Sequence, residues 1–381
     1  MRDLSEIRTQ IDSIDQQILE LVQQRMDLMP YVAEYKAATG KPIYDRTRER
    51  ANIQRAIERV EPELAGYAAI LETVLMEAAR DAQSKRLSRR SRSSLAIQDA
   101  LACQPPYFPE VAHVACQGVE GAYQQIAADR LFHRAQISFF SSFDEVFDAV
   151  EKEQCQFGIV PLENSTAGSV TSVYDLMMRH SFYIAHSCRL KIDHNLLAPA
   201  GVRKEDVRVI YSHEQAIKQC AAYIASIPNC QVHVCENTAT AAAMVARSQR
   251  TDVAAIASRD CAPLYGLDII DQAVQDKSNN YTRFVCISKD LVIYPGADRT
   301  SLLVITKNEP GSLFKVLARF FALDINLIKL EVRPIPGRDF ESMFYLDIDC
   351  PVAAPKFARL MDSIEDVCDE CRYLGSYSEV L

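Results

Sequence analysis

The sequence predicts a multidomain protein in which an all-α region, a two-lobed α/β region and a small α+β region follow one another. Three observations support this prediction. The 381 residues exceed one typical domain, the N-terminal region repeats apolar residues at helical spacing, and short apolar strands alternate with helices from Val111 onward. We therefore expect domains at residues 1–85, 111–290 and 299–381, with a linker at 86–110.

The N-terminal region is predicted to contain three helices of unequal length. Residues 6–38 form one amphipathic pattern, in which Pro30 should cause a kink because it removes a hydrogen bond from the helix. A second helix is expected from Asp45 to Val60, and a third over 64–78. Such helices cannot all bury their apolar stripes within one copy of the chain. We therefore expect a homodimer, and the sequence leaves further association open.

Residues 86–110 are predicted to be a linker. Five Lys or Arg residues lie among serines between Lys85 and Arg92, and a proline-containing run follows at 104–107. The basic cluster could bind RNA or a membrane surface. The net charge of −9 favours a solvated connector instead and argues against nucleic-acid binding.

The middle region is predicted to form two α/β lobes, 111–188 and 189–290, with a ligand cleft between them. Its apolar strands are expected at Val111–Cys116, Phe157–Val160, Val207–Tyr211, Val232–Cys235 and Val253–Ala257. Pro161 should end the second of these strands, and a polar loop then leads to a helix that begins near Val170. Free N–H groups and the positive end of the helix dipole make such a position suitable for an anionic ligand.

The last eighty or so residues predict a ferredoxin-like βαββαβ domain. The expected order is strand 301–306, helix 312–322, strands 325–333 and 340–349, helix 354–366 and strand 373–377.

Composition limits the cellular setting. The charged N-terminus has no apolar signal region, and no long uncharged stretch could span a bilayer, so we expect no membrane association. The twelve cysteines are scattered singly through apolar segments, which indicates reduced thiols in a cytoplasmic protein. Cys368 and Cys371 have the spacing of a redox or metal motif, but no second Cys or His pair completes a site. We expect no metal and no organic cofactor.

Polar residues on the N-terminal helices form the first candidate site. Arg25 and Lys36 are eleven residues apart and share a helix face, whereas Asp45 and Glu49 lie one turn apart on the second helix. Arg8 precedes Arg25 by seventeen residues, or about 25 Å along an ideal helix. It therefore cannot join Arg25 on one small ligand within a single chain.

Over residues 4–84 these positions resemble the helical class of chorismate mutases, in which an arginine of the first helix reaches the partner's site. The resemblance implies the pericyclic rearrangement of chorismate to prephenate, which needs fixed carboxylates and hydrogen bonds to the ether oxygen but no proton transfer. It implies Lys36 and Gln83 as catalytic donors to that oxygen. The implied substrate-binding residues are Arg8, Arg25, Lys36, Asp45, Arg48, Glu49, Ala79 and Gln83, with Ala79 standing where the family usually has serine.

Two motifs in the middle region form the second candidate site: PLENSTAGSV at 161–170 and NYTRF at 280–284. Together with 118–123 and 211–215, they resemble prephenate dehydratases. The resemblance implies conversion of prephenate to phenylpyruvate with loss of water and CO2, driven by aromatisation. It implies that Thr282 donates a hydrogen bond or a proton to the departing hydroxyl.

The same resemblance supplies a set of residues that line the dehydratase site. They are Glu163, Asn164, Ser165, Ser212, Gln215, Gln219, Thr238, Thr282 and Arg283. Arg283 could hold a substrate carboxylate or bridge the lobes. His213 could be a general acid or a buried structural histidine.

Residues 309–314 and 330–334 resemble the ACT domain, a regulatory domain that responds to phenylalanine. The resemblance implies feedback inhibition through Gly311, Ser312, Leu313, Glu331 and Arg333, with Val332 replacing the usual serine. The alternative is an oligomerisation domain that binds no ligand.

The resemblance covers nearly the whole chain, which is similar to bifunctional chorismate mutase–prephenate dehydratases of phenylalanine biosynthesis. It implies a periplasmic-binding-protein-like fold for the lobes, chorismate and prephenate as substrates, and L-phenylalanine as effector. A mutase fused to a prephenate dehydrogenase would need a Gly-x-Gly-x-x-Gly turn for NAD, which the sequence lacks. A non-catalytic aromatic amino-acid sensor is disfavoured by the residues Arg8, Arg25, Lys36, Gln83 and Thr282.

Overall fold

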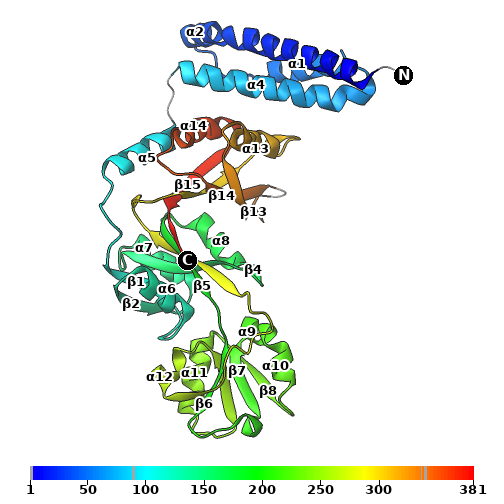
Figure 1. Cartoon of the computed structure of the whole chain (residues 1–381). Helices are drawn as coiled ribbons and strands as arrows, with labels where there is room; N and C mark the ends of the chain where they lie inside the picture. Colours follow the sequence, from blue (N-terminus) through cyan, green and yellow to red (C-terminus); the bar gives the residue numbers. More distant parts are fainter. Residues whose placement is uncertain (1–2, 88–90, 336, 339–340) are drawn as a thin grey trace.

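The computed structural model describes residues 3–87, 91–335, 337–338 and 341–381. A helical domain, a four-stranded sheet and two α/β lobes follow one another along the molecule (Figure 1). The three-part architecture predicted from the sequence is confirmed. Among the described helices, none combines the length and apolar character needed to cross a membrane.

The helical domain contains four α-helices and one short 3-10 turn. These are α1 (Leu4–Asp27), α2 (Met29–Thr39), α3 (Arg46–Ile57), η1 (Pro62–Leu64) and α4 (Ala65–Arg86). The helical pattern predicted over 6–38 is interrupted, as expected, but the interruption lies at Leu28 instead of Pro30. Pro30 lies in the first turn of α2, where a missing N–H removes no intrahelical hydrogen bond.

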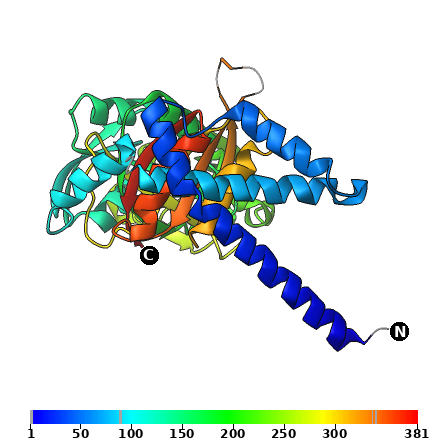
Figure 2. The same cartoon turned by 90° about the horizontal axis from the view of Figure 1, so that it is seen from above.

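Helix α1 buries none of its residues within this chain. Its apolar residues Ile11, Ile14 and Ile18 are between 44% and 54% exposed. Figure 2 shows the N-terminal half of α1 extending away from the rest of the molecule. An apolar stripe of this length on one helix is unusual for a monomer.

The predicted linker is partly helical. Helix α5 (Arg92–Ala102) begins at Ser91, whose hydroxyl accepts a hydrogen bond from the Ser94 amide, and its Ile97 is buried in the core of the C-terminal domain. The expectation of a solvated connector is therefore wrong over 92–102, because this segment has its own apolar face to bury. Arg89 and Arg90 of the basic cluster lie outside the described residues.

The first lobe is a mixed sheet in the order β16-β5-β11-β3-β1-β2, with β4 beside β3. Its strands are β1 (Val111–Gln117), β2 (Arg134–Phe140), β3 (Phe157–Asn164), β4 (Gly168–Ser169), β5 (Tyr183–Lys191), β11 (Tyr281–Ser288) and β16 (Glu379–Val380). Its helices are α6 (Tyr123–Leu131), α7 (Phe143–Glu151) and α8 (Thr171–Arg179).

The second lobe is a five-stranded sheet in the order β10-β6-β9-β7-β8. Its elements are β6 (Asn195–Pro199), η2 (Lys204–Asp206), β7 (Val209–His213), α9 (Glu214–Gln219), α10 (Ala221–Ala225), β8 (Gln231–Cys235), α11 (Thr238–Arg247), β9 (Val253–Ala257), α12 (Cys261–Tyr265) and β10 (Leu267–Asp271). The predicted division at residue 188 needs correction, since β11 returns to the first sheet. The chain therefore crosses between the lobes twice.

Strand β3 does not end at Pro161 as predicted. It continues to Asn164, and its ladder with β11 shifts register between Arg283 and Phe284, so that these residues pair with Glu163 and Pro161. This irregularity accommodates a proline within the strand, because a β-bulge tolerates a residue that has no N–H to donate. The strand thus carries Glu163 and Asn164 as regular ladder residues.

The C-terminal domain has the predicted βαββαβ order and the sheet order β13-β14-β12-β15. Its elements are β12 (Arg299–Ile305), α13 (Ser312–Ala322), β13 (Asn326–Pro334), β14 (Ser342–Asp349), α14 (Pro355–Ile364), η3 (Glu365–Val367) and β15 (Glu370–Tyr377). This is the strand order of a ferredoxin-like domain.

The C-terminal domain and the first lobe share one hydrophobic core. Tyr345 and Tyr377 are fully buried beside Val160, Tyr174 and Val285 of the lobe. The rings of Tyr174 and Tyr345 meet edge to face with centroids 4.9 Å apart. Strand β16, which follows β15, then pairs with β5 of the lobe. The two units are therefore coupled by packing as well as by the chain.

Gly375 marks the closest approach of β15 to the first lobe. Its φ is +137°, and a Cβ there would lie 2.9 Å from the Ile184 nitrogen and closer still to the Ile184 carbonyl oxygen. We predict that Gly375→Ala destabilises the protein by on the order of 3 kcal/mol, because backbone cannot yield as a side chain can. Urea denaturation followed by circular dichroism measures the change.

Gly201→Ala is the matched control. Gly201 also has a positive φ, +82°, but a Cβ there would meet nothing within 4 Å. Its cost should be limited to backbone strain, about 1 kcal/mol. Equal effects of the two variants would contradict the close-packing explanation.

Candidate functional site

A cavity of about 450 Å³ lies between the two lobes, next to the places where the chain crosses from one to the other. Both lobes contribute polar side chains to its wall. Asn164, Thr282 and the segment 167–172 come from the first lobe, and Gln215, Gln219 and Thr238 come from the second. The predicted cleft between the lobes is therefore present.

Thr282 and Asn164 form the centre of the cavity wall. They pair across the β11–β3 ladder, and the Asn164 side-chain amide donates to Thr282 Oγ1 at 2.9 Å. Because that oxygen already accepts a hydrogen bond from Asn164, its own hydrogen is free to be donated to a ligand. A buried hydroxyl prepared in this way is a fixed hydrogen-bond donor.

The other end of Asn164 shapes the loop that follows β3. Its Oδ1 accepts hydrogen bonds from the backbone amides of Thr166 and Ala167, at 3.0 and 2.9 Å. An Asx-type turn of this kind reverses the chain, and it brings 167–172 back to line the cavity. Asn164 therefore positions both Thr282 and the loop.

Gln219 connects the lobes across the cavity. Its side-chain nitrogen donates to Thr166 Oγ1 at 2.7 Å, and its Oε1 accepts from Asn280 at 3.1 Å. The same oxygen lies 2.9 Å from His194 Nε2. Since an amide oxygen can only accept, the hydrogen of the neutral His194 ring lies on Nε2.

His194 was not found from the sequence, because it follows no motif and stands alone at the first crossing between the lobes. It is 3% exposed, and among the described residues its Nδ1 has no hydrogen-bond partner. Burial lowers the pKa of His194, although the hydrogen bond with Gln219 acts in the opposite sense. The ring is therefore neutral at pH 7 and offers an acceptor at the cavity.

Four helices of eight or more residues begin at the cavity. The first residues of α6, α7, α8 and α11, which are Tyr123, Phe143, Thr171 and Thr238, all line it. Neither α6 nor α8 has a side-chain cap on its N-terminal amides. No Lys or Arg is among the described lining residues, so backbone amides and helix dipoles are the source of positive potential for an anion.

Four residues predicted to line the cleft lie elsewhere. Ser165 Oγ accepts from the Tyr281 amide and donates to the Asn279 carbonyl, and Ser212 Oγ donates to the Ile256 carbonyl at 2.6 Å. The two serines thus fix the backbone around the site. Glu163 and Arg283 contact the C-terminal domain instead of the cavity. His213 lines the cavity and caps α9 through its Nδ1.

The polar residues of the helical domain gather around α2, α3 and α4. Arg25 donates to the Leu75 carbonyl, Lys36 donates to the Ile43 carbonyl, and the buried Gln83 donates to the Ala79 carbonyl. Asp45 caps α3 by accepting from the Arg48 amide.

Lys36 lies close enough to the charged residues of α3 and α4 for their charges to act on its pKa. Burial lowers the pKa of Lys36, with Arg48 acting in the same direction, while Asp45 and Glu49 oppose the change. Arg80, missed by sequence reasoning, is 4% exposed and pairs with Glu49. Arg8 is exposed on α1 and is not part of the group within this chain.

The residues predicted to bind phenylalanine fall on two elements. Gly311 precedes α13 with a φ of +82°, and Ser312 and Leu313 begin that helix. On β13, Glu331 accepts from Ser169 Oγ at 2.7 Å and Arg333 pairs with Asp175 at 2.9 Å. Both β13 side chains therefore contact the first lobe, next to the cavity loop.

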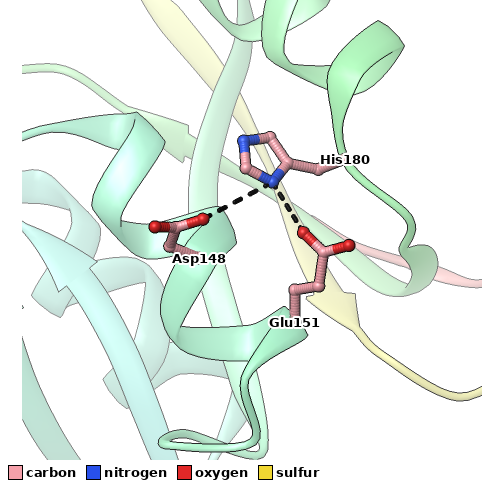
Figure 3. Close-up of side chains that lie close together, drawn as sticks. All are labelled: Asp148, Glu151 and His180. Atoms are coloured by element: carbon pink, nitrogen blue, oxygen red, sulfur yellow. Dashed lines mark hydrogen bonds and ion pairs between the residues drawn. The ribbon is translucent and has the colours of Figure 1, made fainter.

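One group of His and carboxylate side chains among the described residues has a spacing that a metal ion could use. Asp148 and Glu151 of α7 face His180, whose Nδ1 is 2.9 Å from Glu151 Oε2 (Figure 3). Lys152 also pairs with Asp148, and the Phe147 ring stacks on His180. These side chains therefore form an ion-pair cluster in which each charged group has a partner. The cluster lies outside the cavity wall.

Cys368 and Cys371 are not prepared for redox or metal chemistry, which needs the thiolate. Burial raises the pKa of both thiols, that of Cys371 to about 12.

Comparison with known proteins agrees with this geometry. The prephenate dehydratase family model matches residues 114–291, and the chorismate mutase type II model matches 7–84. An Arabidopsis thaliana protein, arogenate dehydratase/prephenate dehydratase 2, is 36% identical over 69% of this chain and 72% of its own length. The bifunctional chorismate mutase/prephenate dehydratase of Escherichia coli is 28% identical over 97% of this chain and 95% of its own length.

A solved structure adds a likeness in three dimensions. The prephenate dehydratase of Arthrobacter aurescens in complex with L-Phe matches with a TM-score of 0.64 and 25% identity, over 70% of this chain and 89% of that one. A mutase fused to a prephenate dehydrogenase would need a dehydrogenase domain after the mutase domain. The dehydratase family model matches that part of this chain instead. The chain belongs to the family of bifunctional chorismate mutase–prephenate dehydratases, whose two activities produce and then consume prephenate.

Proposed function

We propose that prephenate reacts in the cavity between the lobes, with Thr282 donating its hydroxyl hydrogen to the departing ring hydroxyl. The single observation that carries this assignment is the hydrogen bond from Asn164 to Thr282 Oγ1, 2.9 Å long, which leaves the threonine hydrogen for the ligand. Loss of the hydroxyl and of CO2 is driven by aromatisation. The site therefore needs to stabilise a leaving oxygen and orient two carboxylates.

The cavity offers neutral groups for those carboxylates. The uncapped N-termini of α6 and α8 present backbone amides, and Gln215 and Thr238 add side-chain donors. A threonine hydroxyl is a poor acid, so its contribution is a hydrogen bond that strengthens as the leaving oxygen gains charge. Gln219 keeps the lobes at the distance that this arrangement requires.

We infer that the mutase site is completed by a second copy of the chain. Arg25, Lys36 and Gln83 would bind and activate chorismate in one protomer, together with the partner subunit's Arg8. Exposed Ile11, Ile14 and Ile18 on α1 support this arrangement, because a paired α1 would bury them. The remaining substrate contacts are assigned to Asp45, Arg48 and Glu49.

We propose that L-phenylalanine is the effector of the C-terminal domain, bound near Gly311–Leu313 and β13. The Arthrobacter aurescens relative was solved in complex with L-Phe. In this chain the hydrogen bond between Ser169 and Glu331 gives β13 direct contact with the cavity loop. The twelve free cysteines support a reducing, cytoplasmic location.

Replacement of Thr282 tests the dehydratase site. Thr282→Ala should lower dehydratase kcat about 100- to 1000-fold, the usual effect of losing one fixed donor. Thr282→Ser, which keeps the hydroxyl, should retain most of the activity. Phenylpyruvate formation is measured, and mutase activity of the same chain is the control. Near-normal turnover by folded Thr282→Ala would refute the assignment.

Mixing two inactive variants tests the shared mutase site. Arg8→Ala and Arg25→Ala should each abolish most mutase activity. If each site draws these residues from different chains, a mixture after subunit exchange should recover about a quarter of wild-type activity, since half of the dimers then contain one intact site of two. Chorismate consumption provides the readout. Absence of recovery in proven mixed dimers would show that one chain supplies both residues.

The pH dependence of the mutase tests the role of Lys36. Its folded pKa is depressed, so the charged donor is present below that pKa and is lost as the pH rises through it. Mutase kcat/KM should therefore fall at a pH below 10.5, the usual lysine pKa. Lys36→Arg should move this fall to higher pH in a pH–rate profile. An identical alkaline limb in both enzymes would exclude Lys36 as the titrating group.

A further inference from the structure

Arg283 occupies an unexpected position for a residue adjacent to Thr282. Successive side chains of a strand point to opposite faces of the sheet. Thr282 lines the cavity, whereas Arg283 is directed to the face covered by the C-terminal domain, where it is 4% exposed. One strand thus presents a proposed catalytic group on one face and a buried cation on the other.

The C-terminal domain holds the Arg283 guanidinium. Nη1 donates to Asp347 Oδ2 of β14 at 2.5 Å, and Nη2 donates to the Tyr377 hydroxyl of β15 at 2.6 Å. Nε is 3.3 Å from Glu379 Oε2 of β16. Ser301 of β12 joins Asp347 to Tyr377 by hydrogen bonds to both. A buried guanidinium whose three nitrogens contact three separate partners is held in one orientation.

Glu163 extends the same connection to β3. It pairs with Arg283 across the ladder at 3.3 Å and with Lys329 of β13. Burial raises the pKa of Glu163, but the hydrogen bond and charge of Lys329 and the charge of Arg283 outweigh it and hold that pKa below its usual value. The C-terminal domain therefore contacts both strands that carry the Thr282–Asn164 pair, on the sheet face opposite the cavity.

Two features of its pairing indicate that the start of β11 needs these contacts with the C-terminal domain. On the β3 side, the ladder changes register immediately after Arg283, so regular pairing with β3 stops one residue beyond Thr282. On the β5 side, Arg283 stands directly opposite Arg189, and like charges in that position are destabilising. Glu379 contacts both arginines and supplies the counter-charge.

We infer that Arg283 is a positioning residue for Thr282, through which the C-terminal domain keeps the dehydratase donor against Asn164. The inference rests on the proposed role of Thr282. This inference differs from the expectation that Arg283 binds a substrate carboxylate. The N–H groups of Arg283 already donate to Asp347, Tyr377 and Glu163 on the sheet face opposite the cavity.

Tyr377→Phe in the full chain is the least disruptive test, because it removes a single hydroxyl, which accepts from Arg283 and also contacts Ser301. It should lower dehydratase kcat about tenfold while KM stays within about threefold, since the loss concerns the transition state and not binding. Arg372→Gln is the matched control. It breaks hydrogen bonds between the same two units, to the Met177, Met178 and His180 carbonyls, away from β11. Its kcat should stay within about twofold of wild type.

Repeating Tyr377→Phe in a Thr282→Ala background separates positioning from simple loss of folded enzyme. With no hydroxyl to position, the change should lower the residual dehydratase activity by less than about twofold. A tenfold fall in both backgrounds would mean that Tyr377→Phe merely unfolds part of the sample, and the inference would fail.

Two further results would also overturn the inference. An unchanged kcat for Tyr377→Phe would show that the grip on Arg283 is not needed for turnover. A raised KM with unchanged kcat for Arg283→Lys would show that Arg283 holds the substrate. If Thr282→Ala itself kept normal turnover, the proposed role of Thr282 would be refuted first, so the two failures are distinguishable.

Discussion

The structure depends on the pairing of β11 with β3. This ladder sets Thr282 opposite Asn164 and Arg283 opposite Glu163. Because side chains alternate across a strand, the first pair faces the cavity and the second faces the C-terminal domain. A slip of one residue would exchange the two faces and destroy both contacts. The substrate cavity and the connection to the C-terminal domain are therefore two consequences of one register.

The C-terminal domain lies between the helical domain and the first lobe (Figure 1). It also contacts the helical domain through ion pairs. Arg319 of α13 pairs with Glu77 of α4, and Glu77 in turn pairs with Arg80, the partner of Glu49. Glu309, just before α13, pairs with Arg46 of α3. The Arg319–Glu77 and Glu77–Arg80 pairs are buried, so removal of one partner would leave an uncompensated charge. The C-terminal domain thus joins two catalytic units that share no contact of this kind with each other among the described residues.

Sequence reasoning identified the parts of the site that local patterns encode. Thr282, Asn164 and Gln219 lie in motifs, and the structure brings them together at the cavity. Three outcomes depend on tertiary context that no local pattern reports. His194 stands alone and gains its place only when the chain crosses between the lobes. Pro161 stays within β3 because the opposing strand shifts register. The environment of Arg283 comes from residues at least 64 positions away in the sequence, on either side of it.

The most direct test of this account is a crystal structure of the full chain with a non-reactive prephenate analogue. The account predicts Thr282 Oγ1 at hydrogen-bonding distance, roughly 2.6–3.2 Å, from the oxygen that represents the departing hydroxyl. It also predicts that Arg283 remains bound to Asp347 and Tyr377. An analogue whose carboxylate is held by Arg283, with Thr282 directed elsewhere, would contradict the account.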